Sequence, residues 1–162
     1  MNKPVIEIQD VIRYPEADLA PEFSIMAIHP RHVKSILQGV KYWEYRKSSM
    51  IGLMEGDVYI YATSPLSKIV GRIRIGGEYS GPKENVWEFT RAESGIDGNE
   101  FKDYFQDYWM AYAARITYIK LIKGPTLQEI RQKCMFAYNT WQPPQTWTYM
   151  NGMTKLRATW EI

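Results

Sequence analysis

The segment from Gly39 to Arg46 reads Gly-Val-Lys-Tyr-Trp-Glu-Tyr-Arg and brings a lysine, a carboxylate and a guanidinium together in one short stretch. Such a set could bind an anion or move a proton, because it combines two cations with one carboxylate. In an extended strand Glu44 and Arg46 share one face, whereas Lys41 lies on the other. Ionised side chains are costly to bury unless they are paired. The spacing therefore predicts either an exposed strand with an incidental ion pair or a polar cleft.

The neighbouring elements must hold this segment in place. A strand over 23–28 ends at His29-Pro30, and a short helix over 31–38 follows, which Gly39 ends. The segment itself is predicted to be a strand over 42–47. Further strands are expected over 58–62, 69–75 and 112–123, a helical region over 83–108 broken at two glycines, and a capped helix from Thr126 to about Phe136.

This order of elements predicts an α+β domain, since strands and short helices follow one another without regular β-α-β alternation. A small curled or barrel-like sheet with helices around it is the expected architecture. Neither a Gly-x-Gly-x-x-Gly motif nor a P-loop occurs, which argues against a Rossmann fold. Residues 1–22 are proline-containing and predict an N-terminal arm before a single domain over 23–162. A strand-like stretch follows the proline-rich 142–149 and runs to Ile162.

Composition narrows the class of protein further. The 162 residues suffice for one domain with a real core, and 45% apolar with 23% charged residues is ordinary for a globular chain. Six Trp, 12 Tyr and 5 Phe are more aromatic residues than such a core needs, which favours a binding surface. A net charge of +2 is too small to indicate a polyanion partner, so local clustering of charge must decide.

Cysteine and histidine are too scarce for several kinds of site. The single cysteine, Cys134, excludes an internal disulfide and reads as a buried thiol in a helix. Two histidines and one cysteine make a zinc site improbable, and no metal or other cofactor is expected. There is no run of 18 apolar residues and no leader-like start, so we expect a soluble cytoplasmic protein without a membrane partner.

The motifs together resemble the ASCH family of the PUA-like superfamily. The resemblance is carried by strand-His29-Pro30, Gly39-x-Lys41-x-x-Glu44-x-Arg46, Gly56-Asp57 before the strand ending in Ser64-Pro65, and Ile69-Val-Gly71. It covers roughly residues 24–122, with an extension through 149. It implies a PUA-like small mixed β-barrel surrounded by short helices.

The resemblance also implies binding of RNA or a nucleotide in a cleft beside the barrel, and a role in regulating transcription or translation. Single-stranded RNA is recognised by stacked aromatic rings, with cations on its phosphates. Cations cluster at His29, Arg31, His32, Lys34, Lys41, Arg46 and Lys47, and candidate stacking rings are Trp43, Tyr45, Tyr61, Trp147 and Tyr149. Core packing competes for each ring and is the stronger interpretation for Trp43 and Tyr61. The predicted ligand-binding residues are His29, Arg31, Lys41, Glu44, Arg46, Ser64, Trp147 and Tyr149.

An enzyme is the main alternative, with Lys41 and Glu44 as its catalytic residues. Some ASCH proteins resemble an amidohydrolase of acetylated cytidine that uses a lysine, a threonine and a glutamate. Lys41 matches the lysine of that group, but Glu44 stands where its threonine is expected. The glutamate of that group would fall near Glu100. A ribonuclease would need an acid, a base and a cation, which His29 and the same strand could supply. Lys41 would act as a base only if burial outweighed nearby carboxylates, which raise a lysine pKa. A protein-interaction module is the third alternative; the oligomeric state is left open.

Overall fold

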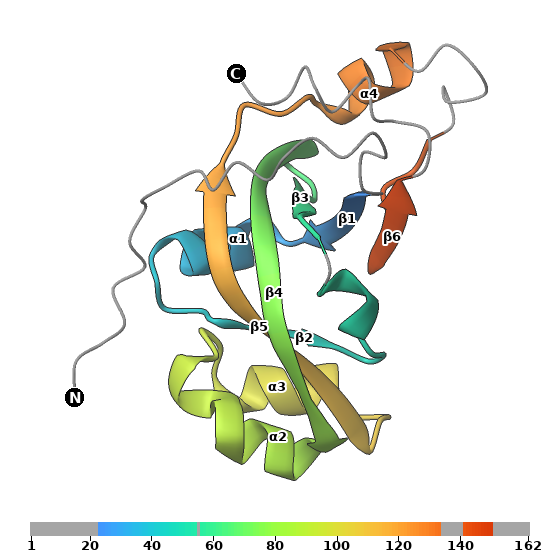
Figure 1. Cartoon of the computed structure of the whole chain (residues 1–162). Coiled ribbons are helices and arrows are strands. Elements are labelled where there is room, and N and C mark those ends of the chain that lie inside the picture. Colours follow the sequence, from blue (N-terminus) through green and yellow to red (C-terminus); the bar gives the residue numbers. More distant parts are fainter. Residues whose placement is uncertain (1–22, 55, 134–140, 151–162) are drawn as a thin grey trace.

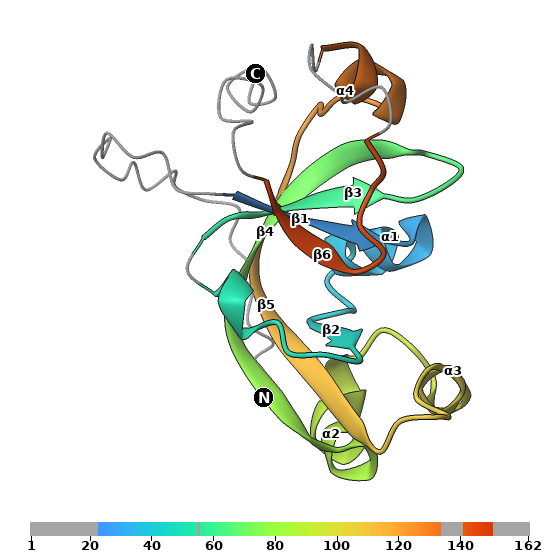
Figure 2. The same cartoon turned by 90° about the vertical axis from the view of Figure 1, so that its right-hand side faces the viewer.

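The computed structural model describes residues 23–54, 56–133 and 141–150, which form one curled, mixed sheet (Figure 1). Six strands follow the order β2-β5-β4-β3-β1-β6 in this part of the chain. They are β1 (Phe23–Ile28), β2 (Trp43–Arg46), β3 (Val58–Ala62), β4 (Lys68–Pro82), β5 (Met110–Leu121) and β6 (Trp147–Met150). Among these six strands, β1 and β3 pair in parallel and the other neighbours pair antiparallel. Figure 2 shows the long β4–β5 ribbon, with β2 beside it, curving away from β1, β3 and β6, so the sheet is an open half-barrel.

Short helices cover the sheet. They are α1 (Pro30–Leu37), α2 (Lys83–Thr90), α3 (Gly98–Tyr104) and α4 (Leu127–Lys133), with 3₁₀ turns η1 (Ile51–Leu53) and η2 (Arg91–Glu93). In Figures 1 and 2, α2 and α3 lie together at one end of the β4–β5 ribbon, and α4 lies at the other. None of the helices in the described ranges is long and apolar enough to cross a membrane.

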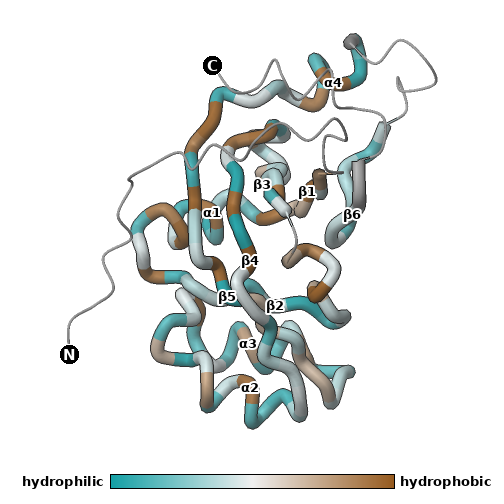
Figure 3. The backbone as a smooth tube through the Cα atoms, in the orientation of Figure 1, coloured by the Kyte–Doolittle hydropathy of each residue, from teal (hydrophilic) through white to brown (hydrophobic). Residues whose placement is uncertain are grey.

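In the described part of the chain the core consists of three clusters of side chains. Every residue of β1 and β3 is buried, because α1 and η1 cover one face of these strands and α4 covers the other. Strands that are buried on both faces read as continuous apolar runs, as these do. Figure 3 shows apolar residues recurring in α1, in the central strands and in η1. The third cluster joins β2 and β5 to α2 and α3 through Tyr45, Val86, Phe101, Phe105, Ala111 and Ala113.

Most predicted elements are confirmed. β1 and β3 have the expected bounds, and in β4 the predicted inward positions 69, 71, 73 and 75 are buried. The capping box forms as predicted, since Thr126 N donates to Glu129 Oε2 at 2.8 Å and Glu129 N donates to Thr126 Oγ1 at 3.2 Å.

Two expectations differ from the structure. β4 continues to Pro82, because β5 pairs with it along its whole length. The segment that holds Trp147 is a strand, β6, because its backbone pairs with the edge of β1. The predicted arm over 1–22, Cys134 and the last stretch to Ile162 lie outside the described residues.

Candidate functional site

A buried ionic cluster of Lys41, Glu44 and Arg46 lies at β2. Glu44 Oε1 is 2.9 Å from Arg46 Nη2, and Glu44 Oε2 is 3.6 Å from Lys41 Nζ. The exposed fractions of these residues are 3% for Lys41, 6% for Glu44 and 9% for Arg46. The cluster therefore holds two buried cations against one buried carboxylate, and the predicted Glu44–Arg46 pair is not a surface feature.

Long-range backbone contacts position the two residues on β2. Glu44 is opposite Ala114 in the β2–β5 ladder, and the small alanine side chain is fully buried there. Arg46 Nη2 also donates to the Ala27 carbonyl at 2.7 Å, which ties β2 to β1 across the interior of the half-barrel. These contacts satisfy groups that would otherwise be costly to bury.

Lys41 is held by the turn before α3. Its backbone forms an isolated bridge with Ser94, and its Nζ donates to the Ser94 carbonyl at 3.3 Å. Gly95 allows this approach: it has φ +66°, and a Cβ there would lie 2.5 Å from the Lys41 Cβ. A side chain at Gly95 would therefore displace Lys41 from the cluster.

The predicted alternation of faces is wrong at Lys41. The strand begins only at Trp43, and Tyr42 N donates to the Glu93 carbonyl instead of continuing the β2 ladder. With period two lost at this point, the lysine side chain turns toward Glu44, three residues further on. Its Nζ also lies 4.9 Å from the centroid of the Tyr45 ring.

Burial sets the acid–base properties of the cluster. Desolvation lowers the pKa of Lys41 below its ordinary 10.5, while the negative charges of Glu44 and Glu100 act in the opposite direction without overcoming it. Burial thus outweighs the nearby carboxylates, which is the condition under which Lys41 could act as a base. Burial also lowers the pKa of His32, and the positive charge of Lys41 lowers it further.

Three residues form a more exposed rim beside the cluster: Arg31, His32 and Glu100. Arg31 binds the Glu100 carboxylate through two nitrogens, at 2.6 and 3.2 Å, and His32 Nε2 lies 3.4 Å from Glu100 Oε1. Glu100 is therefore an ion-pair partner close enough to act on Lys41. Ser94, Gly95 and this pairing of Glu100 could not be found from local patterns, because all depend on contacts distant in sequence.

The other predicted ligand-binding residues lie in different settings. His29 is exposed and caps α1, since its Nδ1 accepts from Arg31 N at 3.2 Å. Trp147 is partly buried against the core beside β1. Tyr149 pairs with Ser24 through its backbone, and its side chain lies outside the described residues. Two candidate stacking rings, Tyr45 and Tyr61, are buried in the core.

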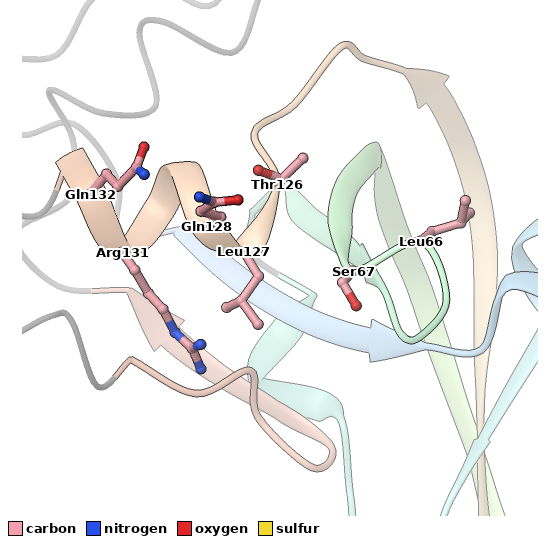
Figure 4. Close-up of a pocket in the computed structure, with 7 residues that line it drawn as sticks. All are labelled: Leu66, Ser67, Thr126, Leu127, Gln128, Arg131 and Gln132. Carbon is pink, nitrogen blue, oxygen red and sulfur yellow. The ribbon is translucent and has the colours of Figure 1, made fainter.

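Ser64 is exposed in the turn after β3, and no hydrogen bond or ion pair among the described residues joins it to the cluster. The same turn faces a pocket of about 420 Å³ (Figure 4). This pocket is lined by Leu66, Ser67, Thr126, Leu127, Gln128, Arg131 and Gln132. The role of Ser64 as a hydrogen-bond donor to a ligand stays a prediction. Within the described ranges no group of three or more His, Cys, Asp or Glu side chains could hold a metal ion.

The first testable prediction concerns stability. Replacing Arg46 with Met leaves Glu44 buried with only the longer Lys41 contact, and should lower the free energy of unfolding by about 3–5 kcal/mol. Arg31→Met is the matched control, because it breaks an ion pair whose arginine side chain is 61% exposed. This change should lower the free energy of unfolding by about 1 kcal/mol or less. Urea unfolding of both variants checks this. Equal losses would show that burial of the cluster does not govern its energetics.

Comparison with known proteins supports the assignment of the fold. No family model matches the chain. A curated relative, an ASCH domain-containing ribonuclease from Zymomonas mobilis, is 22% identical over 127 residues, which cover 78% of this chain and 83% of the relative. The crystal structure of an ASCH protein from the same organism superposes with a TM-score of 0.73 at 23% identity, covering 86% of this chain and 96% of that one.

A crystal structure of a point mutant of that ASCH protein also gives a TM-score of 0.73, at 22% identity, over 87% of this chain and the whole of the other. The half-barrel with its short helices is thus the fold of these ASCH structures. The motif resemblance, the curated match and the shared fold agree: this chain is similar to ASCH-domain proteins in sequence and has their fold.

Proposed function

We propose that this ASCH domain binds RNA, with a phosphate or a base held at the cluster of Lys41, Glu44 and Arg46. The observation that supports this proposal most strongly is the excess of positive charge, because two cations and one carboxylate are buried together. A buried charge without a counter-charge is unfavourable, and an anionic ligand would supply one. The curated relative is named a ribonuclease, an enzyme that acts on RNA, and this supports RNA as the ligand class.

Unused hydrogen-bonding groups support the same proposal. Arg46 Nε and His32 Nδ1 are buried and have no hydrogen-bond partner among the described residues. In this proposal Lys41 and Arg46 contact phosphate or base acceptors, while Glu44 orients Arg46 or accepts from an exocyclic amine. The exposed Arg31–Glu100 pair contributes little stability, so Arg31 can exchange Glu100 for a phosphate as RNA enters.

The wider setting is part of the proposal. The domain would span residues 23–162 and follow an arm over 1–22, and the protein would act in the cytoplasm, where RNA binding could regulate transcription or translation. Ser64, Trp147, Tyr149 and His29 remain the proposed peripheral contacts.

The second prediction tests RNA binding. Lys41→Met keeps the length of the side chain, removes its charge and leaves the Glu44–Arg46 pair in place, so the fold should persist. Affinity for a hexauridylate with 2′-fluoro sugars, which resists cleavage, should fall by about tenfold or more at fixed salt. The dependence of affinity on salt should also weaken. Fluorescence anisotropy measures both quantities.

Lys34→Met is the control for this experiment, since it removes an exposed lysine from the neighbouring helix α1. A Lys41 variant that folds normally and binds with unchanged affinity would exclude the cluster as the RNA site.

A ribonuclease is the second candidate, favoured by the lowered pKa of Lys41. A neutral lysine could take the proton from a ribose 2′-hydroxyl, whose oxygen then attacks the adjacent phosphorus. Arg46 would stabilise the charge on the phosphorane, and departure of the 5′-oxygen, which takes up a proton, would leave a 2′,3′-cyclic phosphate. The amidohydrolase is not supported in this way, because the residue in place of the threonine is Glu44, whose carboxylate is held by two cations.

The third prediction separates a nuclease from a binding protein. If the chain is a ribonuclease, a 2′-hydroxyl hexauridylate should be cut, and the rate should fall by roughly 10²-fold or more in Lys41→Met. Chromatography of the products should show cyclic phosphate ends. Intact RNA after long incubation with protein that binds it would leave binding as the function and remove the catalytic role of Lys41.

A further inference from the structure

Two exposed tyrosines, Tyr104 and Tyr108, contact the lysine that follows the ionic cluster in sequence. Lys47 directly follows Arg46, and its Nζ lies 4.8 Å from the ring centroid of Tyr104 and 4.6 Å from that of Tyr108. Tyr104 is 39% exposed and Tyr108 is 43% exposed. A cation and two accessible rings thus lie together in space, and the cation directly follows Arg46 of the ionic cluster in sequence.

The ring of Tyr104 packs against a buried ring. The centroids of the Tyr104 and Phe105 rings are 4.8 Å apart in an edge-to-face contact, and Phe105 is fully buried in the cluster between α3 and the sheet. Burial raises the pKa of Tyr104, and the charges of Arg46 and Glu44 both act on its hydroxyl. The ring is therefore a supported surface within electrostatic reach of the ionic cluster.

Packing alone does not account for this arrangement. Phe101 and Phe105 already fill the core beneath, whereas Tyr104 and Tyr108 leave more than a third of their surface in water. Trp109, the next residue along the chain after Tyr108, is 72% exposed. Flat rings beside an exposed cation suit a nucleotide, whose base stacks and whose phosphate pairs with the cation.

We propose that Tyr104, Tyr108 and Lys47 form a subsite for a second nucleotide, next to the one held at the ionic cluster. This inference rests on the proposed RNA-binding function. A base stacks on a tyrosine ring as RNA binds, and Lys47 moves from the rings to the phosphate between the two nucleotides. Stacking of one base is worth roughly 5- to 150-fold in affinity, against roughly two- to fivefold for each of the two exposed cation–π contacts of Lys47. The new contact between Lys47 and the phosphate adds to the gain.

The fourth prediction uses ring-removing and ring-keeping variants. Tyr104→Leu and Tyr108→Leu should each weaken binding of 2′-fluoro hexauridylate by roughly fivefold or more, whereas Tyr104→Phe and Tyr108→Phe should keep the affinity within about twofold. Binding of uridine 5′-monophosphate, which fills only the cluster, should be the same in all four variants. Lys47→Ala should reduce the salt dependence of hexauridylate binding, and Lys102→Ala, an exposed lysine on α3, should not.

The outcomes distinguish this subsite from the RNA-binding function itself. If the leucine variants fold and bind hexauridylate as tightly as the wild-type protein does, the subsite is overturned but the RNA-binding function is not. Equal losses for hexauridylate and the monophosphate would also overturn it, because the rings would then be supporting the cluster. Wild-type protein that binds neither probe would overturn the proposed function and the subsite with it.

Discussion

The Glu44 carboxylate is the group on which the site depends. It lies in the interior of the half-barrel between Arg46 and Lys41, and an isolated carboxylate there would be strongly destabilising. Arg46 reaches on to the carbonyl of Ala27 on β1, and Lys41 reaches the carbonyl of Ser94 before α3. One charged side chain therefore links three segments of the fold, and in doing so leaves an excess of positive charge buried among them.

Much of the fold could be predicted from local patterns. The continuous apolar runs of β1 and β3, the alternation in β4 and the capping box at Thr126 each state a local preference, and the structure follows them. β6 could not be predicted in this way, because its strand conformation comes from pairing with the edge of β1. The bounds of β4 likewise depend on its partner β5, which lies far along the chain.

The members of the ionic cluster could be named from the sequence, but their geometry could not. Gly39-x-Lys41-x-x-Glu44-x-Arg46 contains the three residues that the structure pairs, whereas period two placed Lys41 on the wrong face, since Ser94 and Gly95 draw it out of the strand. The role of these residues in binding stays a prediction. The direction in which the pKa of Lys41 shifts could not be predicted from the sequence either, because it depends on how deeply the tertiary structure buries the amine relative to its carboxylate neighbours. The same holds for Lys47 and Tyr104, which are distant in sequence and in contact in space.

The pKa of Lys41 is the most direct test of the proposal that the buried cluster binds an anion. It can be followed by NMR of the lysine ¹³Cε signal, assigned by its loss in Lys41→Met, in a pH titration with and without 2′-fluoro hexauridylate. We expect a pKa below 10.5 in the free protein, where desolvation dominates, and a higher one with RNA bound, because a phosphate favours the charged amine. A pKa at 10.5 or above in the free protein, or one that RNA leaves unchanged, would contradict the assignment of this cluster as the RNA site.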